Sequence, residues 1–131
     1  MSVAGMGIDL VSLQDAFAGS EDILAQMLTL FDAQARERMA QLKAALAAWE
    51  VATARQLLHS LVNISGAVHA YGMSEQTKAL GDAVKQDDRL MAAQLLEALE
   101  LEAERVLRQT GVLLSALAKE PASIWDAALP D

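Results

Sequence analysis

The chain has 131 residues, no cysteine and a formal net charge of -8 at pH 7. One compact domain fits this length, disulfide and thiolate chemistry is excluded, and an acidic surface disfavours binding to the phosphate backbone of nucleic acids. Apolar residues make up 53% of the chain and aromatic residues only 4%, which is typical of a helical bundle rather than a β-sheet protein. We therefore expect an all-α protein.

The first two helices are predicted from capping residues and apolar spacing. A short helix over about 9–18 ends at Gly19, and Ser20 is a suitable N-cap for a long helix that runs to about Trp49. The long helix has one apolar face, with spacings of three and four residues, made of Leu24, Met27, Leu28, Phe31, Ala35, Met39, Leu42 and Leu46. We expect this face in the core.

A third helix is predicted over about 50–71, with Gly72 as its C-terminal stop and Ser74 as the cap of the next helix. At about 100° per residue, its core face is centred on Leu61. The residues that share this face are Ala54, Leu57, Leu58, Leu61, Ile64, Ser65 and Val68.

Two further helices complete the predicted bundle. One covers about 74–86 and is expected to bury Ala79, Leu80, Ala83 and Val84. Asp87-Asp88 interrupts the pattern and caps a last helix over about 89–118, which Pro121 ends. Because short connections between long helices imply antiparallel neighbours, we predict an up-down antiparallel four-helix bundle with an additional short N-terminal helix.

The predicted bundle domain spans residues 1–118, and residues 119–131 form a C-terminal tail. We expect Trp125 in this tail to pack loosely. The chain is expected to be a monomer, because the bundle can bury its own apolar faces.

His59 is the polar residue that stands out in the third helix. It lies about 160° from Leu61 around the helix, so its imidazole is expected to point to solvent while the opposite face is buried. Val62, Asn63 and Gly66 follow it on the exposed side. Since these side chains are small or medium in size, another protein can approach the imidazole closely.

The segment His59-Ser60-Leu61-Val62-Asn63-Ile64-Ser65-Gly66-Ala67-Val68-His69 resembles the signature of histidine-containing phosphotransfer (HPt) domains. The histidine, the leucine two residues later and the small residues Ser65-Gly66-Ala67 match it. Val62, Asn63 and His69 stand where the family has a lysine and two glycines. Three other segments resemble the family in order and spacing, so that the likeness covers about residues 7–118: Gly7-Ile8-Asp9-Leu10, Met27-Leu28-Thr29-Leu30-Phe31 and Leu42-Lys43-Ala44-Ala45-Leu46.

The resemblance implies that His59 accepts a phosphoryl group. The protein would then relay phosphoryl groups to or from receiver-domain aspartates, or from a hybrid histidine kinase, in a bacterial two-component phosphorelay. It would be a phosphohistidine carrier rather than a classical enzyme, without a cofactor of its own, and the partner receiver would supply Mg²⁺. A second reading stays open: a degenerate HPt-like bundle that docks a receiver or kinase without being phosphorylated, since Val62 and Asn63 depart from the motif.

Arg55 and Asn63 are candidates to assist His59. Arg55 lies one turn before the histidine and can replace the missing lysine as the cation that meets phosphate charge. Lys78 and Lys85 on the next helix are weaker candidates. Asn63 can donate a hydrogen bond to the imidazole or to a phosphate oxygen.

The expected partner surface comprises Val62 and Gly66 together with Met27 and Phe31 of the long helix, which the resemblance places near the histidine. Gly66 is explained equally well by close approach of a partner or of a neighbouring helix. His69 lies at the boundary of the buried face and is expected to be structural or half-exposed.

A membrane span, a metal site and a signal peptide are not expected. Residues 56–74 carry no formal charge but include several polar side chains that are costly in hydrocarbon. His59 and His69 are ten residues apart and no Glu-x-x-His pair occurs, so the spacing of a helical metal site is missing. The N-terminus has no basic start followed by an apolar run, and we expect a cytoplasmic protein.

Overall fold

The computed structural model describes residues 7–121 and 124–125, and within them the chain forms five helices and no strand. A short α1 (Leu10–Phe17) precedes four long helices. These are α2 (Glu21–Ala47), α3 (Val51–Ala67), α4 (Tyr71–Lys85) and α5 (Arg89–Lys119). The predicted all-helical class is therefore confirmed. No described helix is both long enough and apolar enough to cross a membrane.

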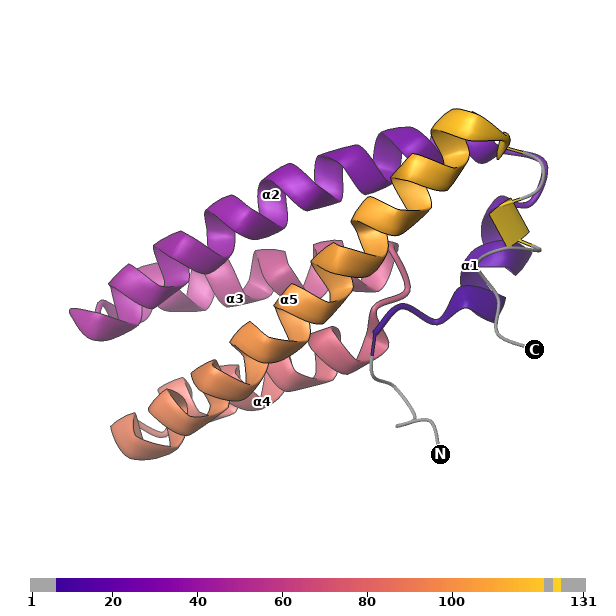
Figure 1. Cartoon of the computed structure of the whole chain (residues 1–131). Helices are drawn as coiled ribbons and strands as arrows, with labels where there is room; N and C mark the ends of the chain where they lie inside the picture. The colour runs from indigo at the N-terminus through magenta and orange to yellow at the C-terminus, as the bar shows by residue number, and fades with distance from the viewer. Residues whose placement is uncertain (1–6, 122–123, 126–131) are drawn as a thin grey trace.

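The long helices pack around one core. α2 and α4 each pack against both α3 and α5, so α3 and α5 occupy opposite corners of the bundle. In Figure 1, α5 lies in front of α3, and α2 and α4 lie on either side. The short α1 contacts α2 at one end of the bundle. The outward faces of α3 and α5 consequently point away from each other.

Most residues of the apolar faces predicted for α2 and α3 are buried. On α2, Leu24, Leu28, Phe31, Ala35 and Leu42 are buried. On α3, the buried residues of the predicted face are Ala54, Leu58, Leu61 and Ser65, and Val68 follows the helix end. The prediction for α4 was right for Leu80, Ala83 and Val84 but wrong for Ala79, which is exposed.

The ends of α3 and α4 differ from the prediction. α3 ends at Ala67, so Gly72 is not its stop: it lies in the first turn of α4, and Ser74 is buried inside α4 rather than capping it. His69 takes a positive φ of 61° instead of a glycine. The N–H groups of His69 and Ala70 then donate to the carbonyls of Gly66 and Ser65, the hydrogen-bond pattern of a Schellman cap.

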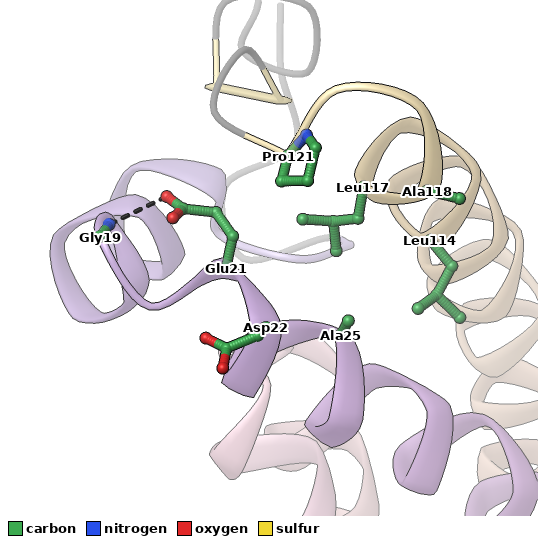
Figure 2. Close-up of a pocket in the computed structure, with 8 residues that line it drawn as sticks. All are labelled: Gly19, Glu21, Asp22, Ala25, Leu114, Leu117, Ala118 and Pro121. Atoms are coloured by element: carbon green, nitrogen blue, oxygen red, sulfur yellow. Dashed lines mark hydrogen bonds between the residues drawn. The ribbon is translucent and has the colours of Figure 1, made fainter.

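The packing of Trp125 also differs from the prediction. Its side chain is only 6% exposed and its Nε1–H donates to Glu21 Oε2 at 3.1 Å, while Ile124 belongs to the hydrophobic core. Expecting a loosely packed Trp125 was therefore wrong, because a carboxylate at the start of α2 gives its N–H a partner. Figure 2 shows this end of the bundle, where the same carboxylate accepts a hydrogen bond from the Gly19 N–H at 2.9 Å.

Lowering the pH is expected to release Trp125 from Glu21. Hydrogen bonds from the Gly19 backbone N–H, first, and from the Trp125 indole hold the pKa of Glu21 below its ordinary value of 4.5. A depressed carboxyl pKa stabilises the folded state above the unfolded pKa, and this stabilisation is lost as the pH falls through the folded pKa. Indole fluorescence should therefore shift toward that of exposed tryptophan below pH 4.5.

The fluorescence of Trp125→Phe, subtracted from that of the wild type, isolates Trp125 from Trp49. Glu21→Gln is the matched control, because its amide still accepts hydrogen bonds but does not titrate. A transition of Trp125 with the same midpoint in Glu21→Gln would assign the acid response to another group.

Candidate functional site

His59 projects from the middle of α3 into solvent, as the helical wheel predicts. Leu58 and Leu61, on either side of it in sequence, are buried and fix the rotation of the helix about its axis. A neutral imidazole ring keeps one nitrogen with a free lone pair, which can act as a nucleophile. The bundle thus presents a nucleophile at a fixed place on its surface.

Asn63 contacts the imidazole directly. Its Nδ2 lies 3.4 Å from His59 Nε2, one helical turn along α3, which confirms the expected contact between the two side chains. With the amide in this orientation, Nδ2–H donates and Nε2 carries the lone pair, so the proton of the neutral ring is on Nδ1. In this orientation the amide leaves the Nε2 lone pair as the nucleophilic one.

A shallow groove of about 270 Å³ runs between α3 and α4 beside His59. It brings together Arg55 from α3 with Lys78 and Lys85 from α4, three of the chain's 10 Lys and Arg residues. Its complete lining is Arg55, Leu58, His59, Val62, Thr77, Lys78, Gly81, Asp82 and Lys85. The groove also contains one carboxylate, Asp82, so its lining carries more positive than negative side chains in a chain with a net charge of -8, and repulsion of an anionic group is reduced there.

The three cations differ in whether a carboxylate already pairs with them. Lys78 Nζ lies 3.3 Å from Glu75 Oε1, so part of its charge is already matched. Within the part of the chain that the structure describes, Arg55 forms no ion pair. Its guanidinium is also able to hold two phosphate oxygens at once, which an ammonium group cannot do in a fixed geometry. Arg55 is therefore the strongest candidate to meet a phosphoryl group on His59.

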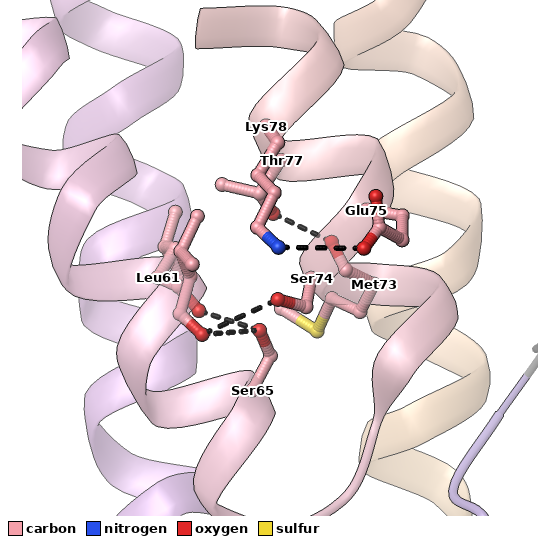
Figure 3. A network of polar contacts seen from close by, with 8 residues as sticks. Leu61, Ser65, Met73, Ser74, Glu75, Thr77 and Lys78 are labelled. Carbon is pink, nitrogen blue, oxygen red and sulfur yellow. Dashed lines mark hydrogen bonds and ion pairs between the residues drawn. The ribbon is translucent and has the colours of Figure 1, made fainter.

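A polar network holds α4 against the turn of α3 that follows His59. Ser65 Oγ donates to the Leu61 carbonyl at 2.6 Å, and Ser74 Oγ of α4 lies 3.5 Å from the Val62 carbonyl. Figure 3 shows these hydroxyls between the two helices, with Thr77 bonded to the Met73 carbonyl at 2.7 Å. Ser65 and Thr77 bond to carbonyls of their own helices, so these buried hydroxyls lie between α3 and α4 without being left unpaired.

The residues predicted for the partner surface differ in exposure, and one of them is buried in the core. Val62 and Gly66 are half-buried on the outward side of α3, and Met27 is half-buried on α2. A Cβ added at Gly66 meets nothing within 4 Å, so no neighbouring helix requires the glycine. Phe31 is only 2% exposed and belongs to the core, and so it was wrongly assigned to a docking surface.

Ile23 and Leu30 supply the exposed apolar surface that Phe31 does not. They lie on one side of α2 with Met27, at the i, i+4, i+7 spacing of a helix face. Lys43, on the opposite edge of α2, pairs with Glu100 of α5 at 3.7 Å. Ile23 and Leu30 therefore lie on the edge nearer α3. The i, i+7 spacing was present in the sequence, but only the core packing shows which edge stays exposed.

His69 is structural, as expected. Its Nδ1 lies 2.6 Å from the Tyr71 hydroxyl, its ring meets Phe17 edge-on at 6.3 Å, and its carbonyl accepts the Asp9 N–H at 2.8 Å. It thus joins the α3–α4 connection to the segment that leads into α1. Among the described residues, no three His, Asp or Glu side chains gather closely enough to hold a metal ion.

No protein-family model, curated protein or solved structure matches this chain. A function must therefore be argued from the residues of the site: an exposed histidine, an amide that contacts its imidazole, and a basic groove beside it.

If His59 accepts a phosphoryl group, replacing Arg55 by alanine is expected to slow the transfer about tenfold, because one charge-assisted hydrogen bond to the phosphoryl group is lost. Lys78→Ala and Lys85→Ala should slow it less, since Lys78 is already paired with Glu75, and both lysines lie on α4 rather than on the helix that carries His59. Val62→Lys should partly restore transfer in the Arg55→Ala background, because it returns a cation beside His59. Rapid-quench transfer rates test this order, and wild-type rates for Arg55→Ala would remove Arg55 from the site.

Proposed function

We propose that this protein is a histidine phosphotransfer protein, which relays a phosphoryl group to or from receiver-domain aspartates in a bacterial two-component phosphorelay. The observation that carries the proposal is the basic groove of Arg55, Lys78 and Lys85 beside the exposed His59 of an acidic protein. The resemblance of the His59 segment to the HPt signature supports the same function. The proposal includes an up-down antiparallel four-helix arrangement, a cytoplasmic location, and a receiver domain or hybrid kinase as partner.

The proposed reaction is a reversible exchange of one bond to phosphorus. The Nε2 lone pair of His59 attacks the phosphorus of a receiver's aspartyl phosphate, an N–P bond forms, and the P–O bond to the aspartate breaks. The aspartate leaves as a carboxylate, and the imidazole keeps its proton on Nδ1. Positioning and charge stabilisation dominate such transfers, so that an exposed histidine and nearby cations are the main groups this chain must supply. The Mg²⁺ would be bound by the receiver.

A second function is favoured by one specific observation. Val62 and Asn63 stand where the HPt signature has a lysine and a glycine, and Asn63 hydrogen-bonds the very nitrogen that would be phosphorylated. This would suit a bundle that docks a receiver or kinase without accepting the phosphoryl group.

Incubation with a receiver carrying radiolabelled aspartyl phosphate separates the two functions. We expect acid-labile, alkali-stable label on the wild type and none on His59→Ala. His69→Asn is the matched control at the second histidine, because asparagine tolerates the positive φ of that position, and it should still be labelled. Binding of the receiver by the wild type without any label would support the docking function instead.

A further inference from the structure

The three most exposed large apolar side chains in residues 7–121 and 124–125 all lie on α5. Leu90 is 72% exposed, Leu101 68% and Val112 67%, and each is eleven residues from the next. Eleven residues make three turns plus about 20°, so the three side chains form one straight stripe along the helix. Leu99 and Val106, on the other side of α5, are fully buried. The stripe therefore occupies the outward face of the bundle.

Charged side chains between these apolar residues differ along the stripe. Glu97 lies between Leu90 and Leu101, whereas Arg105 and Arg108 lie between Leu101 and Val112, with Glu104 beside them. The N-terminal half of the face is thus acidic and the C-terminal half carries two arginines. Arg105 pairs with Glu102 of its own helix at 3.5 Å, whereas Arg108 forms no ion pair within the described residues. Single exposed apolar residues are ordinary on protein surfaces, but equal spacing combined with opposite charge in the two halves makes this face complementary to itself.

We propose that the outward face of α5 binds a second copy of this chain, with the two α5 helices antiparallel and the two-fold axis at Leu101. Leu101 of one copy then contacts Leu101 of the other. Leu90 of one copy faces Val112 of the other, because Leu90 and Val112 are each eleven residues from Leu101. Glu97 of each copy approaches Arg105 and Arg108 of the other. A parallel arrangement would instead set Glu97 against Glu97, which is repulsive.

This dimer leaves both candidate sites free. α3 and α5 occupy opposite corners of the bundle, so joining two copies through α5 leaves each His59 on an outer surface (Figure 1). The inference replaces the monomer expected from the sequence, and it does not rest on the proposed phosphotransfer. The contact consists of one helix face from each copy, a small interface, so the dimer is expected to be weak.

Disulfide trapping tests the arrangement, because the natural chain has no cysteine. Leu101→Cys should form a covalent dimer on mild oxidation. An equimolar mixture of Leu90→Cys and Val112→Cys should give the mixed disulfide in clear excess over random pairing, since only the antiparallel register brings these positions together. Random pairing in the mixture would overturn the proposal.

Sedimentation equilibrium supplies a second measurement on unmodified chains. The wild type should reach twice the 14.0 kDa of one chain at high concentration, and Leu101→Asp should raise the dissociation constant at least about tenfold with unchanged helix content. Val11→Asp is the matched control, an exposed apolar position on α1 away from the stripe. Glu97→Arg should also weaken the dimer, and adding Arg108→Glu should restore it. A wild type that stays monomeric at about 1 mM, or a dimer that survives Leu101→Asp, would overturn the proposal.

Discussion

Gly66→Leu is expected to abolish receiver binding while leaving the bundle folded. Gly66 lies two turns after His59 on the outward side of α3, and the space where its Cβ would project is open. The Cβ of a leucine there has open space around it, and the substitution removes the helix-interior glycine that costs about 1 kcal/mol relative to alanine. The same side chain would occupy the space through which a receiver must approach the imidazole. We expect a loss of affinity of about 100-fold at unchanged or higher Tm.

Gly111→Leu provides the matched control for this variant. Gly111 is also a helical glycine whose added Cβ meets nothing within 4 Å, but it lies on α5, away from His59. Both variants should gain similar stability in urea unfolding, and only Gly66→Leu should lose binding in a titration with the receiver. Unfolding of Gly66→Leu would instead mean that the glycine serves helix packing, and undiminished binding would move the partner to another face.

Leu61→Ala is expected to lower the free energy of unfolding by about 3 kcal/mol. Leu61 is fully buried at the centre of the α3 face that packs on the core, two residues from His59. Truncating it removes buried apolar surface and leaves a cavity that rigid neighbouring helices fill only in part. The measurement is urea unfolding followed by circular dichroism.

Leu30→Ala is the matched control for this variant. It removes the same atoms from an exposed position on α2, and the free energy of unfolding should change by less than about 0.5 kcal/mol. Equal effects of the two substitutions would mean that α3 does not pack through Leu61, and the outward orientation of His59 would lose its basis.

The periodicity of apolar residues was sufficient to predict the helices and the orientation of His59. Burial depends on the side of a helix a residue occupies, and that side follows from sequence spacing alone at 3.6 residues per turn. Leu58 and Leu61 on one side therefore placed His59 on the other before any neighbour of α3 was known. Its contact with Asn63 was predictable for the same reason, since the two residues are one turn apart.

The ends of the helices were less predictable. Trp49, His69 and Asp87 each take a positive φ after a helix, where a glycine is the usual signal. Contacts from distant parts of the chain accompany these conformations: Trp49 Nε1–H donates to Asp87 at 2.7 Å, and Arg89 stacks on the Trp49 ring at 4.9 Å. Trp49 and Asp87, 38 positions apart, meet only once the α2–α3 and α4–α5 connections lie at the same end of the bundle.

The groove beside His59 likewise depended on tertiary structure. The sequence placed Arg55 one turn from the histidine, but Lys78 and Lys85 join them only because α4, rather than α5, packs against that side of α3. Phe31 was misplaced for a different reason. Its spacing put it on the apolar face that was expected in the core, where it lies, and only the family resemblance assigned it to the partner surface.

Sequence alone thus determined what each helix buries, because that property is repeated locally along the chain, while the tertiary structure decided which surfaces meet. Glu102 is a residue whose burial the sequence pattern did not predict. A carboxylate in a long amphipathic helix is normally exposed, yet Glu102 is buried and its Oε2 accepts the Gly7 N–H at 2.5 Å across 95 residues of sequence. Nearby, Gln109 Oε1 accepts the Ile8 N–H at 2.7 Å. Burying such a group is favourable only when a donor is in place, and no local pattern specifies a donor from the other end of the chain.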